Sequence, residues 1–320
     1  MKVTVLVITY NSDLYKTCLT LQSVIEQKFD EFEIVISDDG SKENHFPELR
    51  NFLEEKEFTN YKLVANEKNR GTVQNLLSGL QHTEGKYVKF ISAGDALYEE
   101  NTLQKSFDFM EKNQCACCFG LLQGYRTDEL GILQKIKYFH PFDLTAYRRK
   151  DTKRIVKNLV LYSDNVCGAS IFYEKEFALE YMNRIQKEVL YEEDIFQVLA
   201  AVDDRPLLLY DDYMIWYEIG TGMTTSKHSS FEKLIREDVD RFYRQLYRQY
   251  GDNQYVIKRF RLLKLYKIKN LYVRTIIRFF VNPDALRYCI EAMVQRKRNV
   301  HQKKTDVVGF LEREDFWKQL

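Results

Sequence analysis

Two loops in the first seventy residues carry side chains suited to binding a nucleotide. Asp38 and Asp39 stand next to each other before Gly40, which permits a tight turn. Carboxylates there can accept hydrogen bonds from a nucleobase N–H or a ribose hydroxyl. Asn69 and Arg70 add an amide and a guanidinium group, and the guanidinium suits a phosphate or the edge of a base. These residue types predict a nucleotide site, although Asp-Asp-Gly-Ser by itself can also be a simple turn.

Two further acidic segments have the chemistry of a metal ligand and of a general base. Asp95 follows the small residues Ala93 and Gly94, which leave space for a metal ion and a diphosphate. Three consecutive acids at 192–194 repel one another, which can raise one pKa toward neutral. Such a carboxylate can take a proton from a hydroxyl. The alternative for this run is a solvated helix start, because carboxylates favour helix N-termini.

The elements that must position these loops follow from the spacing of apolar residues. The pattern predicts strands at 3–9, 32–37, 61–65 and 87–91, and helices at 14–25, 48–56 and 72–82. Strands that alternate with helices over short connections indicate a parallel sheet covered by helices. In such sheets a ligand binds beyond the carboxyl ends of the strands. We therefore expect the loops at 9–11, 38–41, 66–71 and 92–95 to meet at one edge.

Five motifs in order resemble family 2 glycosyltransferases with the GT-A fold. They are Val-Ile-Thr-Tyr-Asn at 7–11, Ile-Ser-Asp-Asp-Gly-Ser at 36–41, Asn66 with Asn-Arg-Gly at 69–71, Phe-Ile-Ser-Ala-Gly-Asp at 90–95 and Tyr-Glu-Glu-Asp at 191–194. Gly-Thr-Gly-Met-Thr-Thr at 220–225 is similar to bacterial polysaccharide and glycan-assembly members. The resemblance covers residues 1–226 and implies an α/β fold with a Rossmann-like, mostly parallel sheet flanked by helices.

The resemblance also implies roles for the loop residues in binding a UDP-sugar. The position of Asp39 binds the uracil, that of Asp38 supports the nucleotide site, and the ring of Tyr10 can stack on the base. The nucleotide-binding residues expected in these motifs are Thr9, Tyr10, Asn11, Asp38, Asp39, Asn69, Arg70 and Ser92.

For the reacting groups, Asp194 matches the catalytic base of inverting members, and we expect Glu193 to act beside it. Asp95 matches the last carboxylate of the element that binds Mn²⁺ or Mg²⁺ through the diphosphate. Many relatives have two or three acids there, whereas this chain has Asp95 alone, so the predicted metal site has a single protein carboxylate. His228 is a candidate to complete it.

The predicted function is an inverting glycosyltransferase that moves a sugar from a UDP-sugar to a hydroxyl of a bacterial surface glycan. The acceptor is expected on a lipid carrier or a glycoprotein. One alternative is a nucleotidyltransferase that makes sugar nucleotides, but that class usually has a glycine-rich loop where this chain reads Tyr10-Asn11-Ser12. The other is an inactive scaffold subunit, suggested by the single acid at Asp95.

Charge divides the chain near residue 226. From Lys227 onward 22 Lys/Arg stand against 11 Asp/Glu, whereas residues 1–226 carry 26 against 36. We therefore predict a catalytic domain at 1–226 and a basic helical C-terminal region at 227–320.

The basic region has several possible partners. Residues 254–282 hold eight Lys/Arg, no acid, and apolar residues at roughly helical spacing. This pattern predicts packing or homo-oligomerisation, or contact with an anionic membrane surface or acceptor; a nucleic acid is not expected because no binding module accompanies it.

The compartment is predicted from cysteines and hydropathy. Six cysteines without metal-ligand spacing indicate reduced thiols. No signal peptide or membrane span is evident. We expect a cytoplasmic protein that can also lie as a peripheral protein at the inner face of the cell membrane.

Overall fold

The computed structural model describes residues 1–127, 132–138, 140–220, 229–265, 268–298 and 307–320. Its strands are β1 Val3–Thr9, β2 Phe32–Asp38, β3 Tyr61–Ala65, β4 Tyr87–Ser92, β5 Ala96–Leu97, β6 Cys117–Thr127, β7 Leu133–Ile136, β8 Ile171–Glu174 and β9 Leu208–Glu218. Its α-helices are α1 Leu14–Ile25, α2 Phe46–Glu55, α3 Thr72–Leu80, α4 Thr102–Asn113, α5 Leu144–Arg148, α6 Thr152–Tyr162, α7 Lys175–Ile185, α8 Phe196–Val202, α9 Ser229–Gln249, α10 Gln254–Lys264, α11 Leu271–Val281, α12 Asp284–Lys297 and α13 Glu314–Trp317. Short 3-10 helices lie at Gly168–Ser170, Glu193–Ile195 and Phe310–Glu312.

The strands form one sheet in the order β3-β2-β1-β4-β8-β6-β9-β5, and β7 pairs with β6. β1 runs parallel to both β2 and β4, and β2 runs parallel to β3, which confirms the predicted alternation. Beyond β4 the sheet becomes mixed, because β8 is antiparallel to β4 and to β6 while β9 is parallel to β6. Thr9 pairs with Asp38, and Ile8 with Ser92, so the carboxyl ends of three strands lie level.

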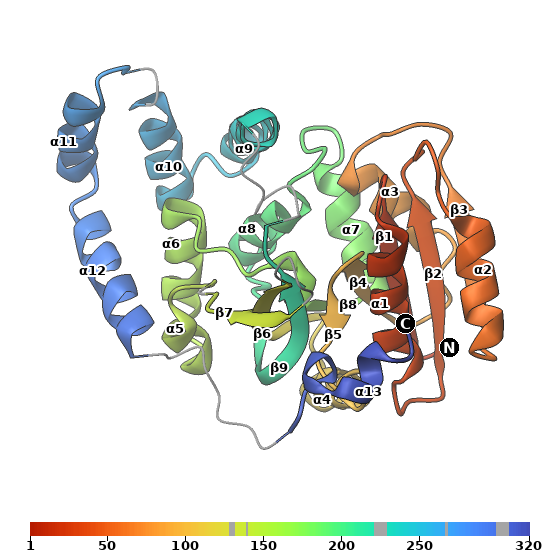
Figure 1. Ribbon diagram of the computed structural model, residues 1–320. Helices are drawn as coiled ribbons and strands as arrows, with labels where there is room; N and C mark the ends of the chain where they lie inside the picture. Colours follow the sequence, from red (N-terminus) through yellow and green to blue (C-terminus); the bar gives the residue numbers. More distant parts are fainter. Residues whose placement is uncertain (128–131, 139, 221–228, 266–267, 299–306) are drawn as a thin grey trace.

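Helices cover both faces of the parallel strands (Figure 1). β1 and β2 are almost continuously buried, as expected for strands with apolar neighbours on each face. On one face Leu6 packs in a cluster with residues of α3 and α7, and on the other Val5 packs with residues of α1, α2 and α4. Asp13 caps α1 by accepting from the Lys16 N–H at 3.0 Å, so the first βα turn ends where the sequence predicts.

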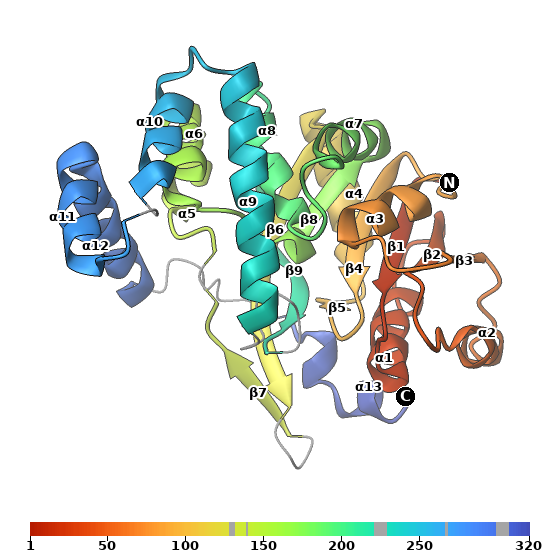
Figure 2. The same ribbon diagram turned by 90° about the horizontal axis from the view of Figure 1, so that it is seen from above.

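The C-terminal region packs on the body unevenly. Phe242, Tyr243 and Leu246 of α9 are buried in the same hydrophobic cluster as the sheet. The last residues return to the sheet edge, where the Phe310 N–H donates to the Tyr98 carbonyl at 2.8 Å. By contrast, α11 and α12 lie along the outer edge of the molecule, with α12 beside α5 and α6 (Figures 1 and 2). Among the described residues no helix has the length and apolarity needed to cross a membrane.

Candidate active site

A cavity of about 460 Å³ opens at the carboxyl ends of β1 and β4. Its lining includes four of the predicted site residues, namely Ser92, Asp95, Glu193 and Asp194. The 3-10 helices at 168–170 and 193–195 form part of the wall, and Glu218 at the end of β9 closes it near Asp95. The structure thus brings residues a hundred positions apart in the sequence into one site.

Asp194 lies in the cavity with one carboxylate oxygen uncommitted. Its Oδ2 accepts a hydrogen bond from the Gly168 N–H at 2.9 Å, while the buried Oδ1 has no partner among the described residues. Only a glycine fits at 168, because a Cβ there would come within 2.0 Å of Asp194 Oδ1. Burial raises the pKa of Asp194 to about 6, although the Gly168 N–H lowers it. A carboxylate with this pKa and a free oxygen can accept a proton near neutral pH.

The two preceding acids also have raised pKa values. Burial is the largest cause for both, and the negative charge of Asp194 is the next. The pKa of Glu192 rises to about 8, and that of Glu193 rises well above its usual range. Burial thus outweighs the mutual repulsion that the sequence suggested. A backbone N–H lowers the pKa of each of Glu193 and Asp194, but burial and the charges of the neighbouring acids keep the pKa of Glu193 well above its usual range.

Asp238 of α9 holds the loop that leads to these acids. It is fully buried, and its Oδ2 accepts from the N–H groups of Leu190, Tyr191 and Glu192 at 3.0, 2.6 and 3.1 Å. Arg241 forms an ion pair with its other oxygen. A carboxylate with three backbone donors and a cation fixes the main chain on which Asp194 is carried.

Asp95 has a second carboxylate beside it, from Glu218. The Glu218 N–H donates to Asp95 Oδ1 at 3.0 Å, and both residues line the cavity. Gly94 has φ +96°, and a Cβ there would lie 2.3 Å from Glu218 Oε2, so the turn brings the two acids together. Burial raises the pKa of Asp95 to about 7, and the charge of Glu218 adds to the rise. Lys16 compensates Glu218 through a 2.6 Å ion pair.

The pair fits a divalent cation. Carboxylate oxygens are the ligands that Mg²⁺ and Mn²⁺ prefer, and two neighbouring acids with unfavourable mutual charge are stabilised by a cation. Asp95 and Glu218 are therefore the residues that would hold the metal, in place of Asp95 alone. His228, the other predicted ligand, lies outside the described residues.

A buried lysine underlies the same site. Lys89 is fully buried in β4, and its Nζ donates to the carbonyls of Phe90 and Ala169 at 2.7 and 2.5 Å. Burial lowers the pKa of Lys89 to about 8, and the negative charge of Asp95 opposes that shift. Lys89 thus ties the strand that leads to Asp95 to the Gly168–Ser170 turn that supports Asp194.

The first nucleotide loop is a closed hydrogen-bonded cluster. Asp38 Oδ2 accepts from the Thr9 hydroxyl at 2.9 Å and from the Ser41 hydroxyl at 2.5 Å. The Asn11 N–H donates to Ser41 Oγ at 2.6 Å, and Asn11 has a left-handed φ of 46°. Thr9, Asn11 and Asp38 therefore shape the loop, and the ring of Tyr10, next to them, stands exposed.

Asp39 organises the second nucleotide loop. Its oxygens accept from the Arg70 N–H at 3.0 and 3.1 Å and from the Gly71 N–H at 2.8 Å. Asn69 Oδ1 also accepts from the Gly71 N–H, at 3.0 Å. The exposed guanidinium of Arg70 bonds to Gln74 at 2.8 Å. Asp39 is buried, and burial raises its pKa although the hydrogen bonds from Arg70 and Gly71 lower it.

Tyr191 connects the nucleotide loops to the cavity. It lines the cavity, and its pKa is raised by burial and then by the charge of Asp238, with smaller contributions from Asp39 and Tyr10 of the nucleotide loops. The predicted nucleotide residues other than Ser92 stand at this neighbouring edge and do not line the cavity.

Three residues of the site were not predicted from the sequence, and they differ in how recognisable they are in it. Lys89 is a charged residue in the middle of an apolar strand, which is a usable signal of a special role. Glu218 lies two residues before Gly220, the first residue of the 220–225 motif, which is a weaker signal. Asp238 lies in a helix with many charged residues, and nothing in the sequence distinguishes it.

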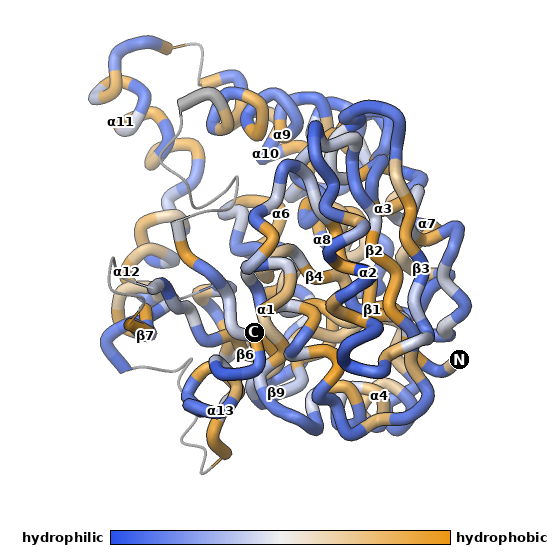
Figure 3. Tube along the Cα trace, turned by 45° about the vertical axis from the view of Figure 1, so that its right-hand side comes forward, coloured by the Kyte–Doolittle hydropathy of each residue, from blue (hydrophilic) through white to orange (hydrophobic). Residues whose placement is uncertain are grey.

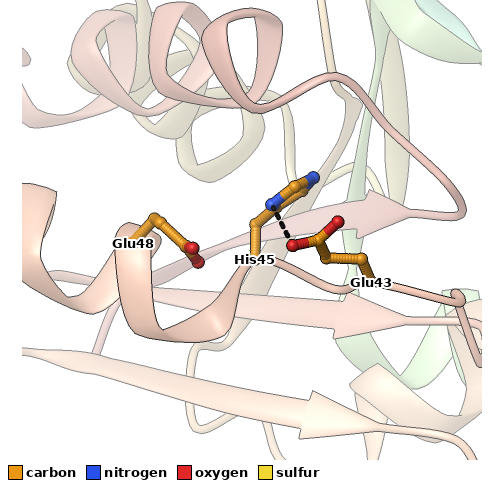
Figure 4. Close-up of side chains that lie close together, drawn as sticks. All are labelled: Glu43, His45 and Glu48. Carbon is orange, nitrogen blue, oxygen red and sulfur yellow. Dashed lines mark ion pairs between the residues drawn. The ribbon is translucent and has the colours of Figure 1, made fainter.

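Another group of possible metal ligands lies apart from the cavity. Glu43, His45 and Glu48 stand together at the start of α2 (Figure 4), with His45 Nδ1 at 4.0 Å from a Glu43 oxygen. Both acids are exposed, and none of the three residues lines the cavity. Exposed clusters of this kind are common, so we assign no role to it.

Comparison with known proteins agrees with this architecture. The chain is 27% identical over 177 residues to an uncharacterized glycosyltransferase of Rickettsia bellii, covering 55% of this chain and 24% of that protein. It is 27% identical over 221 residues to an uncharacterized glycosyltransferase of Haemophilus influenzae, covering 68% and 59%. The chain thus spans less than two thirds of the length of either relative.

A solved structure and a family model complete the comparison. The crystal structure of S. aureus TarS 1-349 in complex with UDP-GlcNAc has a similar fold, with a TM-score of 0.50, 22% identity, and coverage of 75% of this chain and 66% of that one. The model of glycosyl transferase family 2 matches residues 4–178, more than half of the chain and all four parallel strands. The chain belongs to glycosyl transferase family 2.

Proposed function

We propose that the protein is an inverting glycosyltransferase that transfers a sugar from a UDP-sugar to a hydroxyl of a bacterial surface glycan. The acceptor glycan would be carried by a lipid or a glycoprotein. The observation that carries the proposal is that Asp194, whose buried Oδ1 has no hydrogen-bond partner among the described residues, lines the same cavity as Asp95 and Glu218. Sugar transfer from a sugar nucleotide to a hydroxyl requires a group that accepts the hydroxyl proton and groups that act on the diphosphate. In this cavity Asp194 is the proton acceptor, and Asp95 and Glu218 are the carboxylates near the diphosphate.

The chain's own residues would act on the acceptor. Asp194 Oδ1 accepts the hydroxyl proton as the acceptor oxygen forms its bond to the anomeric carbon of the donor. The bond between that carbon and the diphosphate oxygen breaks, and its electron pair leaves with UDP. Attack on the face opposite the departing diphosphate inverts the configuration. The Gly168 N–H and the Asp238-anchored loop keep the Asp194 carboxylate in place.

The other site residues would bind the donor. Asp38 and Asp39, with Thr9, Asn11, Asn69 and Arg70, would shape the nucleotide pocket, Tyr10 would stack on the base, and Ser92 would face the diphosphate. Asp95 and Glu218 would hold Mn²⁺ or Mg²⁺, which when bound stabilises the charge of the departing diphosphate. The TarS neighbour is a complex with UDP-GlcNAc, so that donor is the first to test.

The division of labour along the chain is part of the proposal. Residues 1–226 would form the catalytic domain, and 227–320 would support it and meet its surroundings in the cytoplasm. Glu218 removes the main ground for an inactive scaffold, which was a lone acid at Asp95. The loop after β1 has no glycine, so nothing in it favours a nucleotidyltransferase.

Donor hydrolysis tests the proposal without knowledge of the acceptor. Purified protein is incubated with a panel of UDP-sugars, with Mn²⁺, with Mg²⁺ or with chelator, and UDP release is measured. We expect metal-dependent release from at least one donor. Glu218→Gln should raise the metal concentration needed by about tenfold or more, whereas Glu31→Gln, an exposed partner of Lys2, should not. No release and no UDP binding with any donor would contradict the proposal.

A further inference from the structure

The helix α12 contacts the body through polar groups, buried Ala285 and the ring of Tyr288, which stacks on Tyr162, and not through its main apolar stripe. Its side toward the body carries polar groups, since Glu291 bonds to Arg154 at 2.9 Å and Gln295 bonds to Asp143 at 3.1 Å. The opposite side carries a stripe with helical spacing, formed by Leu286, Ile290, Met293 and Val294, all exposed. A helix that packed only for stability would bury this stripe. Its exposure indicates a surface made to meet something else.

The preceding helix continues that surface. No residue of α11 is buried, although its sequence is rich in aromatic and branched residues. Its side toward α10 carries Arg274 and Arg278, and its outer side carries Val273, Ile276 and Phe280, the last 84% exposed. The two helices follow one another along one edge, and both are marked by hydrophobic residues (Figures 1, 2 and 3).

The charge around the stripe is strongly one-sided. Residues 268–298 hold seven Lys/Arg and two acids. Both acids are already engaged with cations of the body, Asp284 with Lys157 at 2.9 Å and Glu291 with Arg154. The surface therefore presents apolar side chains within a field of positive charge.

We propose that the outer side of α11 and α12, the docking surface (Val273, Ile276, Phe280, Leu286, Ile290, Met293 and Val294), binds the face of an anionic phospholipid bilayer. An apolar stripe bordered by Arg and Lys is the pattern of a helix that lies in the bilayer interface, where apolar groups enter the acyl boundary and cations meet lipid phosphates. With 11 and 14 residues, the two helices are too short to span a bilayer.

A second copy of the chain fits this surface less well. In a two-fold contact the same patch meets itself, which would bring together two segments that each carry seven Lys/Arg against two acids. Their repulsion opposes such a dimer, whereas anionic lipid neutralises the same charges.

Vesicle binding by the full chain tests the proposal. The protein is sedimented with vesicles of phosphatidylcholine alone or with added phosphatidylglycerol, at low and high salt. We expect binding that needs the anionic lipid and weakens with salt. The double variant I276S/F280S should bind the anionic vesicles at least about tenfold more weakly than the parent protein. Ile132→Ser, at a similarly exposed isoleucine before β7, is the matched control and should bind as the parent does.

A native thiol on α12 can report the binding of the docking surface to vesicles. Of the six cysteines, all within the described residues, Cys289 on α12 is the exposed one. Burial raises the pKa of half-buried Cys115 to about 11, so Cys289 should label first at neutral pH. An environment-sensitive dye there should shift to the blue on anionic vesicles.

The outcomes separate this inference from the proposed reaction, because vesicle binding needs no donor. Anionic binding lost in the double variant, with donor hydrolysis unchanged, supports the inference. No vesicle binding, binding undiminished in the variant, or a dimer in light scattering that the variant dissociates would overturn it.

Discussion

The helices α9 and α12 belong to the same basic stretch of sequence, yet they pack on the rest of the protein in opposite ways. α9 buries Phe242, Tyr243 and Leu246 in the central cluster and sends Asp238 to the active-site loop. α12 presents its polar side to the body and its apolar side to solvent. Net charge places both helices in one region, but burial shows that α9 is part of the core that supports the active-site loop and that the apolar side of α12 faces outward.

The largest difference should appear in folding stability. Phe242→Ala removes a ring that is 1% exposed, and should lower the free energy of unfolding by about 3–5 kcal/mol. Phe280→Ala, at 84% exposure, should change it by roughly 0.5 kcal/mol or less. Denaturant unfolding of both variants measures the contrast. Similar losses in the two variants would mean that α11 is covered within the protein itself.

A smaller effect should follow from the polar contact of α9. Asp238→Asn leaves one or more of three backbone N–H groups and Arg241 poorly paired, at a cost of about 1–3 kcal/mol. Transfer should fall by about tenfold or more because the base is no longer held in place, while vesicle binding is unchanged. Asp240→Asn, on the exposed side of the same helix, is the control. Full transfer in Asp238→Asn would remove α9 from the active site.

The smallest expected difference is in pH dependence, which should affect the active site but not the docking surface on α11 and α12. Asp194 must be ionised to accept a proton, and its pKa is raised to about 6. Activity should therefore be full above that pH and fall as the pH drops through about 6, approaching tenfold per unit. Labelled Cys289 should still report vesicle binding there. A rate that stays flat to pH 5 would rule out a base with this pKa.

The regular part of the fold was readable because local pattern and tertiary burial agree there. The predicted strand 3–9 and helix 14–25 coincide with β1 and α1, since a parallel strand buried on both faces is continuously apolar and Asp13 is a strong cap. The mixed sheet beyond β4 was not readable, because antiparallel pairing of β8 between β4 and β6 depends on long-range contacts.

The site was readable where motifs are contiguous. Asp95 and Asp194 stand out at strand and helix ends, and the structure places both in one cavity. Glu218 lines the same cavity from β9, and Asp238 of α9 anchors the backbone of the loop at 190–192 from outside it. Only tertiary structure shows that carboxylates so distant in sequence complete the pair at Asp95 or hold that loop. Likewise, the sequence identifies apolar residues at roughly helical spacing within 254–282 but not which side of α11 faces solvent.

Replacement of Asp194 by Asn tests the central claim most directly. The change keeps the shape and an oxygen that can accept from the Gly168 N–H, but removes the proton acceptor. Transfer from the donor identified by hydrolysis and UDP binding by calorimetry are measured on the same preparation. Asp203→Asn, at the C-terminal end of α8, is compared in parallel. We predict that Asp194→Asn loses transfer by roughly a thousandfold and binds UDP as the parent does. Full transfer in Asp194→Asn would contradict the account.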